Sequence, residues 1–503
     1  MIVERKKCKL KKFHCRLIQI TLIVVGVTLM LSGVLMIFLT PKLISTTIYQ
    51  RKNIAQSNEL YDFWKNPDYK FTSKIFVYSV KNPQQVLNGN KPEVIQIGPY
   101  VYKVSLGKNV ISFGNGSVKY QNVRNFTFDM NASCTECSLT REIWIPNIIF
   151  QKFVEIASNP LTAMAQLALT SQQPFLKASV NDILFNGYED PYLANVCAIP
   201  LVDMICKSVL KVPERIGFLM NRNGAQKIIE ISTGSSDGSI AAGEVLNWNG
   251  LELLPEDYWN SKQAREINGT DGEFYKPLIK KTDIIYEMEY KGISAYRFTV
   301  KEDLLDPAVP GNAGFCHNNG KGIFSEDEKC LPKGLLDLSH CYNGTPPILF
   351  SFPNFLYADE RVKELVIGLN ESSVEHDGII IEIEPQTGTV LRTYVRSQIN
   401  IAMWKGRGII YGTDLSRMQN TIVPLLAEYQ TVEIGDNSLA LLRKMLLLIK
   451  KAFALLCFIP IFVGILFVSI AAFIELLLKK SGPIVCLMFP TQHIFPQKLM
   501  ICF

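Results

Sequence analysis

The fold is decided first by residues 17–40, which read LIQITLIVVGVTLMLSGVLMIFLT and contain no charged residue. A helix rises about 1.5 Å per residue, so this stretch extends roughly 36 Å, enough to cross a hydrocarbon core of about 30 Å. A second uncharged stretch, residues 452–474, reads AFALLCFIPIFVGILFVSIAAFI; Pro460 is expected to kink it, which a membrane helix tolerates. The first run exceeds the apolar core of a signal peptide and Lys42 follows it, so an uncleaved anchor is expected.

Basic residues at the two ends of the chain predict its orientation. Residues 1–16 carry seven basic residues against one acidic, residues 451–503 carry four against one, and residues 41–450 carry 41 against 44. Because basic flanks stay on the cytosolic side, both termini are predicted to be cytosolic. The prediction is a cytosolic tail (1–16), a span (17–40), an extracellular or lumenal domain (41–450), a second span (451–475) and a cytosolic tail (476–503). One basic cluster on the outer side of the second span departs from this pattern: Arg443, Lys444, Lys450 and Lys451.

The composition excludes several classes of protein. The 503 residues are 48% hydrophobic and 19% charged, with a mean hydropathy of +0.14 and a formal net charge of +6. A chain this apolar is neither disordered nor a nucleic-acid-binding tail, so the membrane and not nucleic acid is the expected partner. The positive charge belongs mainly to the two cytosolic ends.

Modification motifs agree with this topology. All six N-x-S/T sequons lie between the spans: Asn115, Asn125, Asn131, Asn268, Asn343 and Asn370. An exoplasmic location also permits disulfides among the seven cysteines of that region. Three cysteines near the bilayer in the tails are palmitoylation candidates, with ordinary reduced thiols as the alternative: Cys8, Cys15 and Cys486.

The region between the spans reads mostly as short antiparallel strands separated by turns. The expected strands are 75–80 (IFVYSV), 100–106 (YVYKVSL), 227–233 (KIIEIST), 296–300, 379–384 (IIIEIE) and 389–404 (TVLRTYVRSQINIAMW). In the stretch 379–384, isoleucines at odd positions alternate with Ile380, Glu382 and Glu384, which predicts a strand buried on one face only. The fold class is therefore α+β, with two membrane helices flanking a large antiparallel β domain.

Residues 146–187 are the exception and are predicted to form three short helices, at about 147–158, 160–171 and 179–186. Asn147 and Asn159 are plausible N-caps, and Ser179 with Asp182 resembles a capping box. These helices are more apolar than one buried face requires, so either they pack on the sheet or part of their surface receives an apolar ligand. The residues considered for such a ligand site are Ile149, Lys152, Phe153, Ile156, Met164, Leu167 and Phe175.

A search for catalytic or metal-binding patterns finds none that is complete, so neither an enzyme nor a cofactor is expected. Cys134 and Cys137 form a CxxC pair that could bind metal or act in redox chemistry, but no second pair completes a zinc site. Gly234–Gly238 matches G-x-S-x-G, yet a hairpin-like sequence and not a helix follows it, which favours a simple turn.

Several long motifs resemble one family. NPQQVLNGNKPEVIQIGPYVYKV (82–104), INGTDGEFYKPLI (267–279), NAGFC (312–316), SFPNFLYADERV (351–362) and EHDGIIIEIEPQTGTVLR (375–392) occur in order. Together they resemble the class B scavenger receptors, which include the fatty-acid translocase, the high-density-lipoprotein receptor and lysosomal integral membrane protein type two. The similarity extends over about residues 10–475.

The resemblance implies a β-barrel ectodomain with a helical bundle at its membrane-distal apex, here 146–187, and an apolar tunnel that carries lipid to or from the bilayer. The implied partners are fatty acids, sterols or phospholipids, lipoprotein particles or a protein ligand, with a homo-oligomer left open. The implied location is the plasma membrane, with the lysosomal or endosomal membrane as the alternative. A receptor for a protein ligand in endolysosomal sorting is the alternative function; a two-span ion channel and an ectoenzyme are remote ones.

Three departures from the family pattern affect these implications. The loop that usually carries the partner of Cys341 is shortened, and the resemblance leaves Cys316–Cys330 as the expected disulfide. The stretch 170–173 is neutral where members that bind anionic modified lipids carry lysines, with only Lys152 and Lys177 near. The tail 481–503 lacks an acidic dileucine motif.

Overall fold

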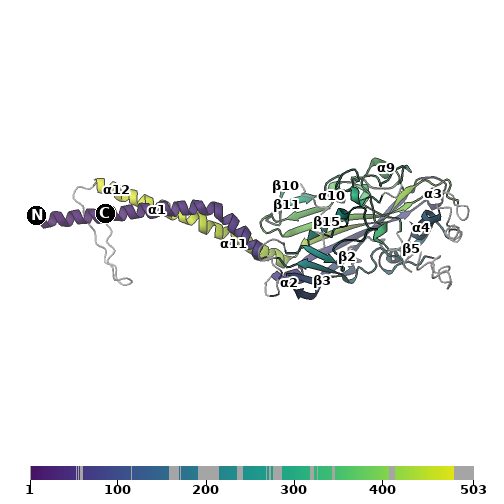
Figure 1. The fold of residues 1–503 in the computed structure, drawn as a ribbon, viewed down its shortest axis with the longest axis horizontal. Helices are drawn as coiled ribbons and strands as arrows, with labels where there is room; N and C mark the ends of the chain where they lie inside the picture. The colour runs from purple at the N-terminus through teal and green to yellow at the C-terminus, as the bar shows by residue number, and fades with distance from the viewer. Residues whose placement is uncertain are drawn as a thin grey trace. The chain divides into compact units, whose positions relative to one another are not determined.

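A computed structural model of the chain divides it into two compact units (Figure 1). Residues 1–51 and 437–503 form one, which we call the terminal unit, and residues 52–436 form the other, which we call the sheet unit. The structure describes residues 2–51, 54, 56, 60–114, 116–157, 169, 172–190, 215–234, 242–267, 269–270, 274–275, 286–317, 322–325, 327–342, 346–406 and 414–480.

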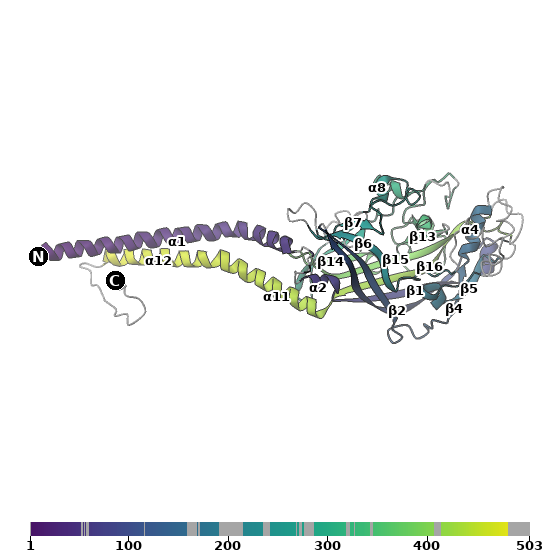
Figure 2. The same ribbon diagram turned by 60° about the horizontal axis from the view of Figure 1, so that its bottom comes forward.

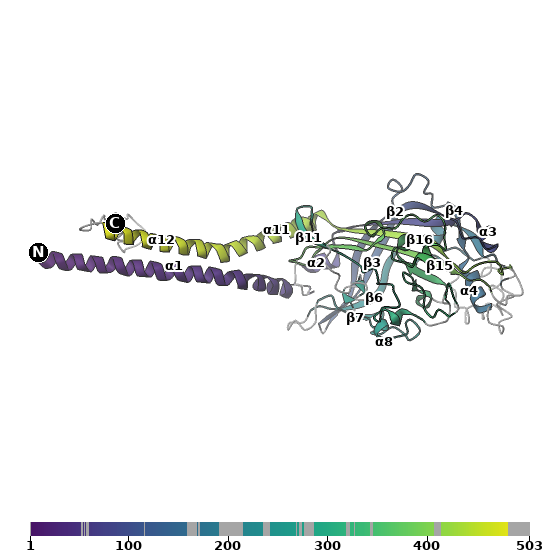
Figure 3. The same cartoon turned by 90° about the horizontal axis from the view of Figure 1, so that it is seen from above.

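The terminal unit consists of long helices (Figure 3). They are α1 (Ile2–Arg51), α11 (Asp436–Phe453), the π-helical turn η6 (Ala454–Phe458) and α12 (Ile459–Lys480). Two segments, Phe13–Ile44 and Asp436–Lys479, are long and apolar enough to cross a membrane. The helices run beyond the predicted spans, and α1 continues through Pro41, which directly follows the first of them. The irregular turn ends two residues before Pro460, which lacks a backbone donor.

Glycines allow α1 and α12 to approach each other closely. A Cβ atom added at Gly26 would lie 2.8 Å from the backbone oxygen of Gly464, and one added at Gly464 would lie 2.5 Å from the oxygen of Gly26. Seven residues further along α1, a Cβ at Gly33 would lie 2.7 Å from the oxygen of Cys457. After another seven residues, Thr40 Oγ1 lies 3.6 Å from the Sγ of Cys457. Small residues at this spacing are typical of helices that associate in lipid.

The sheet unit is built on one antiparallel sheet. Its main path follows β10 (Tyr286–Tyr290), β11 (Ile293–Thr299), β14 (Ile380–Ile383), β15 (Val390–Met403), β16 (Thr421–Ile434), β1 (Tyr69–Val80), β2 (Val94–Gly114), β3 (Ser117–Phe128), β6 (Gly224–Ser232) and β7 (Val245–Trp248). β13 (Ile348–Ser351) pairs with β15 and with β12 (Leu336–Asp337). Two small sheets pair β4 (Glu142–Pro146) with β5 (Phe175–Ser179) and β8 (Gly269–Thr270) with β9 (Phe274–Tyr275).

Short helices and turns connect these strands. They are α2 (Leu60–Lys65), α3 (Pro83–Leu87), α4 (Ile148–Ala157), the π-helical η1 (Asp182–Asn186), α8 (Lys262–Arg265), η3 (Ala313–Phe315), η4 (Ser339–Cys341), η5 (Pro353–Phe355), α9 (Glu360–Lys363) and α10 (Val374–Asp377). α2 and α4 lie at opposite ends of the sheet unit (Figure 2). The chain enters and leaves this unit at the α2 end, because the Gly435 amide donates to the Asp68 carbonyl and the Lys70 ammonium pairs with Asp436 at 2.7 Å.

All six predicted strands are present, but a closed barrel is not formed by the described strands. Their path is open, with β10 at one end and β7 at the other. The described residues between these two edges supply only β8 and β9, which pair with each other and not with either edge. The resemblance predicted closure, and the structure supports only the large antiparallel sheet.

The predicted helical region 146–187 is only partly helical. α4 corresponds to the first predicted helix, 147–158, but the five-residue strand β5 lies where no strand was predicted. The third prediction corresponds to the π-helical η1, and the second, 160–171, lies almost wholly outside the described residues. β5 forms because FLKAS pairs in register with EIWIP of β4, a partner more than 25 residues earlier that local periodicity does not reveal.

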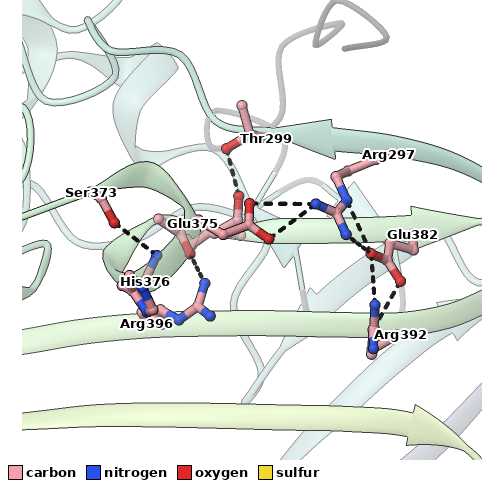
Figure 4. A network of polar contacts seen from close by, with 10 residues as sticks. Arg297, Thr299, Ser373, Glu375, His376, Glu382, Arg392 and Arg396 are labelled. Carbon is pink, nitrogen blue, oxygen red and sulfur yellow. Dashed lines mark hydrogen bonds and ion pairs between the residues drawn. The ribbon is translucent and has the colours of Figure 1, made fainter. Parts of the chain in front are cut away.

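The prediction that one face of residues 379–384 is exposed is wrong. Ile380, Glu382 and Glu384 are buried, and the Glu382 side chain is 0% exposed. Its carboxylate accepts from Arg297 Nη2 at 2.6 Å and from Arg392 Nε at 2.9 Å, from the two strands that flank β14 (Figure 4). A buried carboxylate requires such charge-assisted partners, and these two arginines make a strand buried on both faces tolerable.

Candidate functional site

α4 contributes buried side chains and not an exposed apolar surface. Ile149, Phe153 and Phe175 are 2%, 4% and 4% exposed and belong to one core cluster with residues of β1 and β16. Gln151 is also buried, and its Oε1 accepts from the Trp404 amide at 3.1 Å at the end of β15. These contacts favour the interpretation that α4 packs on the sheet. The side chains of Ile156, Met164 and Leu167 lie outside the described residues.

Local capping explains why this end of the sheet folds as it does. The Phe150 amide donates to Asn147 Oδ1 at 3.0 Å, so Asn147 caps α4 as predicted. The Ser179 hydroxyl donates to Asp182 at 2.6 Å and accepts from the Asp182 amide, which begins η1. η1 therefore starts at a defined point after β5, and its position decides where Phe185 lies.

Lys152 is the one charged residue of the predicted ligand site, and it is mostly buried. Burial lowers the pKa of its ammonium group, while the nearby Asp337 carboxylate opposes that shift. Glu155 lies 3.5 Å from its Nζ on the same helix. Lys152 is therefore engaged with carboxylates of this chain.

A second region offers accessible aromatic surface, which we call the aromatic face: Tyr102 of β2, Phe126 and Phe128 of β3, and Phe185 of η1. In the sheet register Tyr102 pairs with Phe128, and Val104 pairs with Phe126, so the three rings share one side of the sheet. Phe185 covers them, with ring centroids 5.1 Å from Tyr102 and 5.5 Å from Phe126. The three phenylalanines are only half-buried, so the aromatic face keeps apolar surface that another molecule can cover.

The Tyr102 hydroxyl is a polar group without a protein partner among the described residues. The side chain is 3% exposed, and its Oη has no hydrogen bond. Burial raises the pKa of this hydroxyl, so it stays protonated and can donate. A buried donor left unpaired is costly, and a ligand oxygen or a water would satisfy it.

A charged pair adjoins the aromatic face. Ser73 lies directly opposite Tyr102 in the register of β1 and β2, and its hydroxyl donates to the buried Glu428 at 2.7 Å. Arg222 Nη1 lies 3.5 Å from the other Glu428 oxygen, and its side chain is still half-exposed. The side chain of Asn223, the next residue, accepts a hydrogen bond from the Phe126 amide, so the segment that carries Arg222 is tied to β3. Apolar rings next to a guanidinium and a phenol suit an amphipathic ligand.

The cysteines and the other sequence motifs considered for catalysis or metal binding form no catalytic site among the described residues. Disulfides join Cys134 to Cys137 and Cys316 to Cys330, so the CxxC pair is a disulfide in this structure and Cys341 is a free thiol. No group of three or more His, Cys, Asp or Glu side chains suited to a metal ion occurs among the described residues. Most of the G-x-S-x-G match, residues 235–238, lies outside them.

The modification candidates are placed only in part. Asn125, Asn131 and Asn370 are exposed, as a glycosylation acceptor must be. Asn115, Asn268 and Asn343 lie outside the described residues, as do Cys486 and the side chain of Cys8. Cys15 is 3% exposed within the terminal unit. Glycosylation and palmitoylation stay predictions.

Sequence reasoning missed the aromatic face. The local sequence pattern that indicates it is the alternation Tyr100-x-Tyr102 and Phe126-x-Phe128, which places aromatic rings on one side of each strand. The contribution of Phe185 and Arg222 could not be read locally, because each comes from a segment more than 50 residues away from β3.

Comparison with known proteins places the chain. A model of the CD36 family matches residues 24–474. The chain is 26% identical to Lysosome membrane protein 2 of Homo sapiens over 477 residues, which cover 90% of this chain and 93% of the relative. It is 28% identical to Scavenger receptor class B member 1 of Mus musculus over 463 residues, covering 87% of this chain and 85% of the relative. With two helices able to span a membrane and a large antiparallel sheet between them, the chain belongs to the CD36 family, as its resemblance to the class B scavenger receptors predicted.

Proposed function

We propose that the protein is a two-span receptor that binds lipids or lipoproteins and passes a fatty acid or sterol to or from the membrane through a tunnel in its sheet unit. Both termini are cytosolic, with the spans at 17–40 and 451–475. The name of one relative, Scavenger receptor class B member 1, supports a receptor function. No covalent step is required, in keeping with relatives that are receptors and membrane proteins.

The observation that carries the proposal is the aromatic face beside Arg222. A fatty acid has a long apolar chain and a carboxylate, and a sterol has an apolar ring system and one hydroxyl. Phe126, Phe128 and Phe185 would cover the apolar part, while Tyr102 and Arg222 would meet the oxygen. Covering each methylene spares about 0.8 kcal/mol of exposure to water.

The test uses full-length protein in nanodiscs with tritiated oleic acid and tritiated cholesterol. Phe126→Ala is expected to weaken binding of both about tenfold, because a buried phenylalanine contributes about 1.5–3 kcal/mol. Arg222→Gln is expected to weaken oleic acid more than cholesterol, since only the acid carries a charge. Trp144→Ala is the matched control, because Trp144 is an exposed aromatic residue of β4 outside the aromatic face.

The outcomes separate the site from general stability. Equal weakening by Phe126→Ala and Trp144→Ala would reject the aromatic face as the lipid site. Thermal unfolding of each variant shows whether a loss of binding reflects a loss of folding. Uptake of the same lipids by cells, normalised to surface protein, then tests transfer as distinct from binding.

We assign the protein to the plasma membrane, with the lysosomal membrane as the alternative. The name Lysosome membrane protein 2 motivates that alternative, and with it a receptor for a protein ligand in endolysosomal sorting. Microscopy of the tagged full-length protein beside plasma-membrane and lysosomal markers decides between the two membranes.

A further inference from the structure

We infer that the cytosolic end of the terminal unit binds the headgroup of a polyphosphoinositide, an inositol phospholipid that carries several phosphate groups. The residues that would bind it form a basic stripe on α1, defined by Arg5, Lys9, Lys12 and Arg16. The basic stripe belongs to the terminal unit and is separate from the aromatic face. The inference rests on the proposed topology, because inositol phospholipids belong to the cytosolic leaflet.

The spacing of these four residues places them along one side of α1. They occupy positions i, i+4, i+7 and i+11, which is the repeat of one face of an α-helix. The remaining basic residues of the tail do not follow this repeat: Lys6, Lys7 and Lys11. α1 continues without interruption into the apolar stretch, so the basic stripe adjoins the membrane span directly.

The basic stripe extends the side of α1 that packs on α12. Within the span, α1 residues at a seven-residue spacing contact α12: Gln19, Gly26, Gly33 and Thr40. Arg5 and Lys12 continue the same spacing toward the N-terminus. α1 and α12 run side by side (Figure 2), and their glycine contacts show that they are antiparallel. One turn beyond the contact of Gln19 with Glu475, Lys479 therefore lies near the level of Arg16, where cations of both helices come together.

The chain supplies little counter-charge for these cations. Residues 1–16 carry seven basic residues and one acidic residue, and residues 475–503 carry three and one. Of the two acidic residues, Glu475 already accepts from Gln19 at 3.0 Å and lies 3.6 Å from Lys479. Arg16 and Lys479 are both exposed. A basic segment directly cytosolic of a membrane span attracts anionic lipids, so an anionic headgroup is the partner that fits.

The depth of the cations favours a polyphosphoinositide over phosphatidylserine. The uncharged stretch begins at Leu17, so Lys12 lies roughly 7.5 Å and Arg5 roughly 18 Å beyond it along the helix axis. The polar layer of one leaflet is only about 5–8 Å deep. Phosphatidylserine carries its charge within that layer, whereas the phosphates of an inositol ring project beyond it, each with a charge of about −1.5 to −2. A headgroup of this kind can meet cations on successive turns of α1.

The experiment uses full-length protein in nanodiscs of phosphatidylcholine. They contain phosphatidylinositol bisphosphate or, at the same total lipid charge, phosphatidylserine. Both anionic lipids carry the same photoactivatable group on the acyl chain next to the glycerol, and mass spectrometry locates the cross-links. Phosphatidylinositol bisphosphate is expected to label residues 2–20 and 471–480 about fivefold or more over phosphatidylserine.

Two matched triple variants make the result specific. R5Q/K9Q/K12Q removes three cations of the basic stripe and should bring the labelling ratio close to one. K6Q/K7Q/K11Q removes the same charge from the same tail, outside the basic stripe, and should keep at least about half of the ratio. K9R/K12R keeps the charge and should keep the ratio, which tests the inference even if R5Q/K9Q/K12Q folds poorly. Oleic acid binding at the aromatic face should be the same in all these variants, so a failure here is distinct from a failure of the proposed function.

Three results would overturn the inference. The first is equal labelling by the two anionic lipids in the wild-type protein. The second is an equal loss of the ratio in the two triple variants, which would assign the attraction to the net charge of the tail and not to the basic stripe. The third is binding of soluble poly-glutamate in neutral nanodiscs that phosphatidylinositol bisphosphate does not displace, which would assign the basic stripe to an acidic protein segment.

Discussion

The α1–α12 contact and the β11–β14–β15 part of the sheet are held together in opposite ways. Where α1 meets α12, the closest approach is made by Gly26 and Gly464, which have no side chains. In the sheet, a fully buried carboxylate, Glu382, is held between two arginines. The helix contact is close because its glycines lack side chains, whereas the sheet contact depends on charged side chains that pair with one another.

The difference follows from the solvent in which each region folds. In lipid, burying an apolar side chain gains little, so helices associate through close backbone packing between small residues. In the sheet unit, burial removes groups from water, so each buried charge must recover its lost hydration from partners. The two regions should therefore respond to substitution by different mechanisms.

The largest effect is expected from breaking the charge network. Glu382→Ala leaves Arg297 and Arg392 without the carboxylate that both contact, and should lower the free energy of unfolding by about 3–5 kcal/mol. Thermal and denaturant unfolding of the full-length protein measures this loss.

The matched control is Glu433→Ala. Glu433 also faces Arg392, at 3.8 Å, but its side chain is one-third exposed, so its removal should cost less than about 1 kcal/mol. Equal losses for the two variants would contradict the view that burial makes the Glu382 contacts essential.

An intermediate effect is expected from filling the gap between the helices. Gly26→Leu would push a side chain against the Gly464 backbone, at a cost of about 1–3 kcal/mol in helix pairing. Thr40→Cys provides the measurement, because Thr40 Oγ1 and Cys457 Sγ lie 3.6 Å apart and the new thiol should form a disulfide on oxidation. Adding Gly26→Leu should reduce that cross-link.

Val34→Leu, on an exposed side of α1, is the control for added volume. It should leave the Thr40→Cys cross-link intact. If it reduces the cross-link as much as Gly26→Leu does, close glycine packing is not what pairs the helices.

The parts that sequence predicts well are those decided by local pattern. The two apolar helices, the strands such as 75–80, and the Asn147 cap follow from residues near one another in the chain. The burial of Glu382 does not, because Arg297 is 85 residues away and an isolated glutamate in an alternating strand indicates an exposed face. The aromatic face could not be predicted for the same reason, since Phe185 of η1 and the loop that carries Arg222 are far from β2 and β3 in the sequence. Closure of the sheet into a barrel depends on how its two edge strands, β10 and β7, pair, and local sequence pattern does not specify this pairing.

The smallest expected effect concerns His317, a half-buried base without a pair of opposite charges like the one that holds Glu382. Its ring stacks on His340 with centroids 4.0 Å apart and on Trp259 at 5.3 Å. Burial and then the neighbouring His340 lower the pKa of His317, and Asp337 only partly opposes them. Below its ordinary pKa near 6.5 the unfolded chain therefore binds a proton that the folded chain does not, so stability is complete above that pH and falls as the pH decreases.

His317→Gln should remove this part of the acid sensitivity, because glutamine does not titrate. The Tm of the wild-type protein should fall between pH 7.5 and pH 5.0 by more than that of the variant, with a difference corresponding to less than about 1 kcal/mol because the site is partly solvated. His376→Gln is the control, since His376 is exposed and outside the stack. If the wild-type Tm instead rises on acidification relative to that of His317→Gln, the direction of the predicted pH dependence is wrong. The folded chain would then bind the proton more tightly than the unfolded chain. That outcome would make Asp337 a counter-charge as effective for His317 as the two arginines are for Glu382.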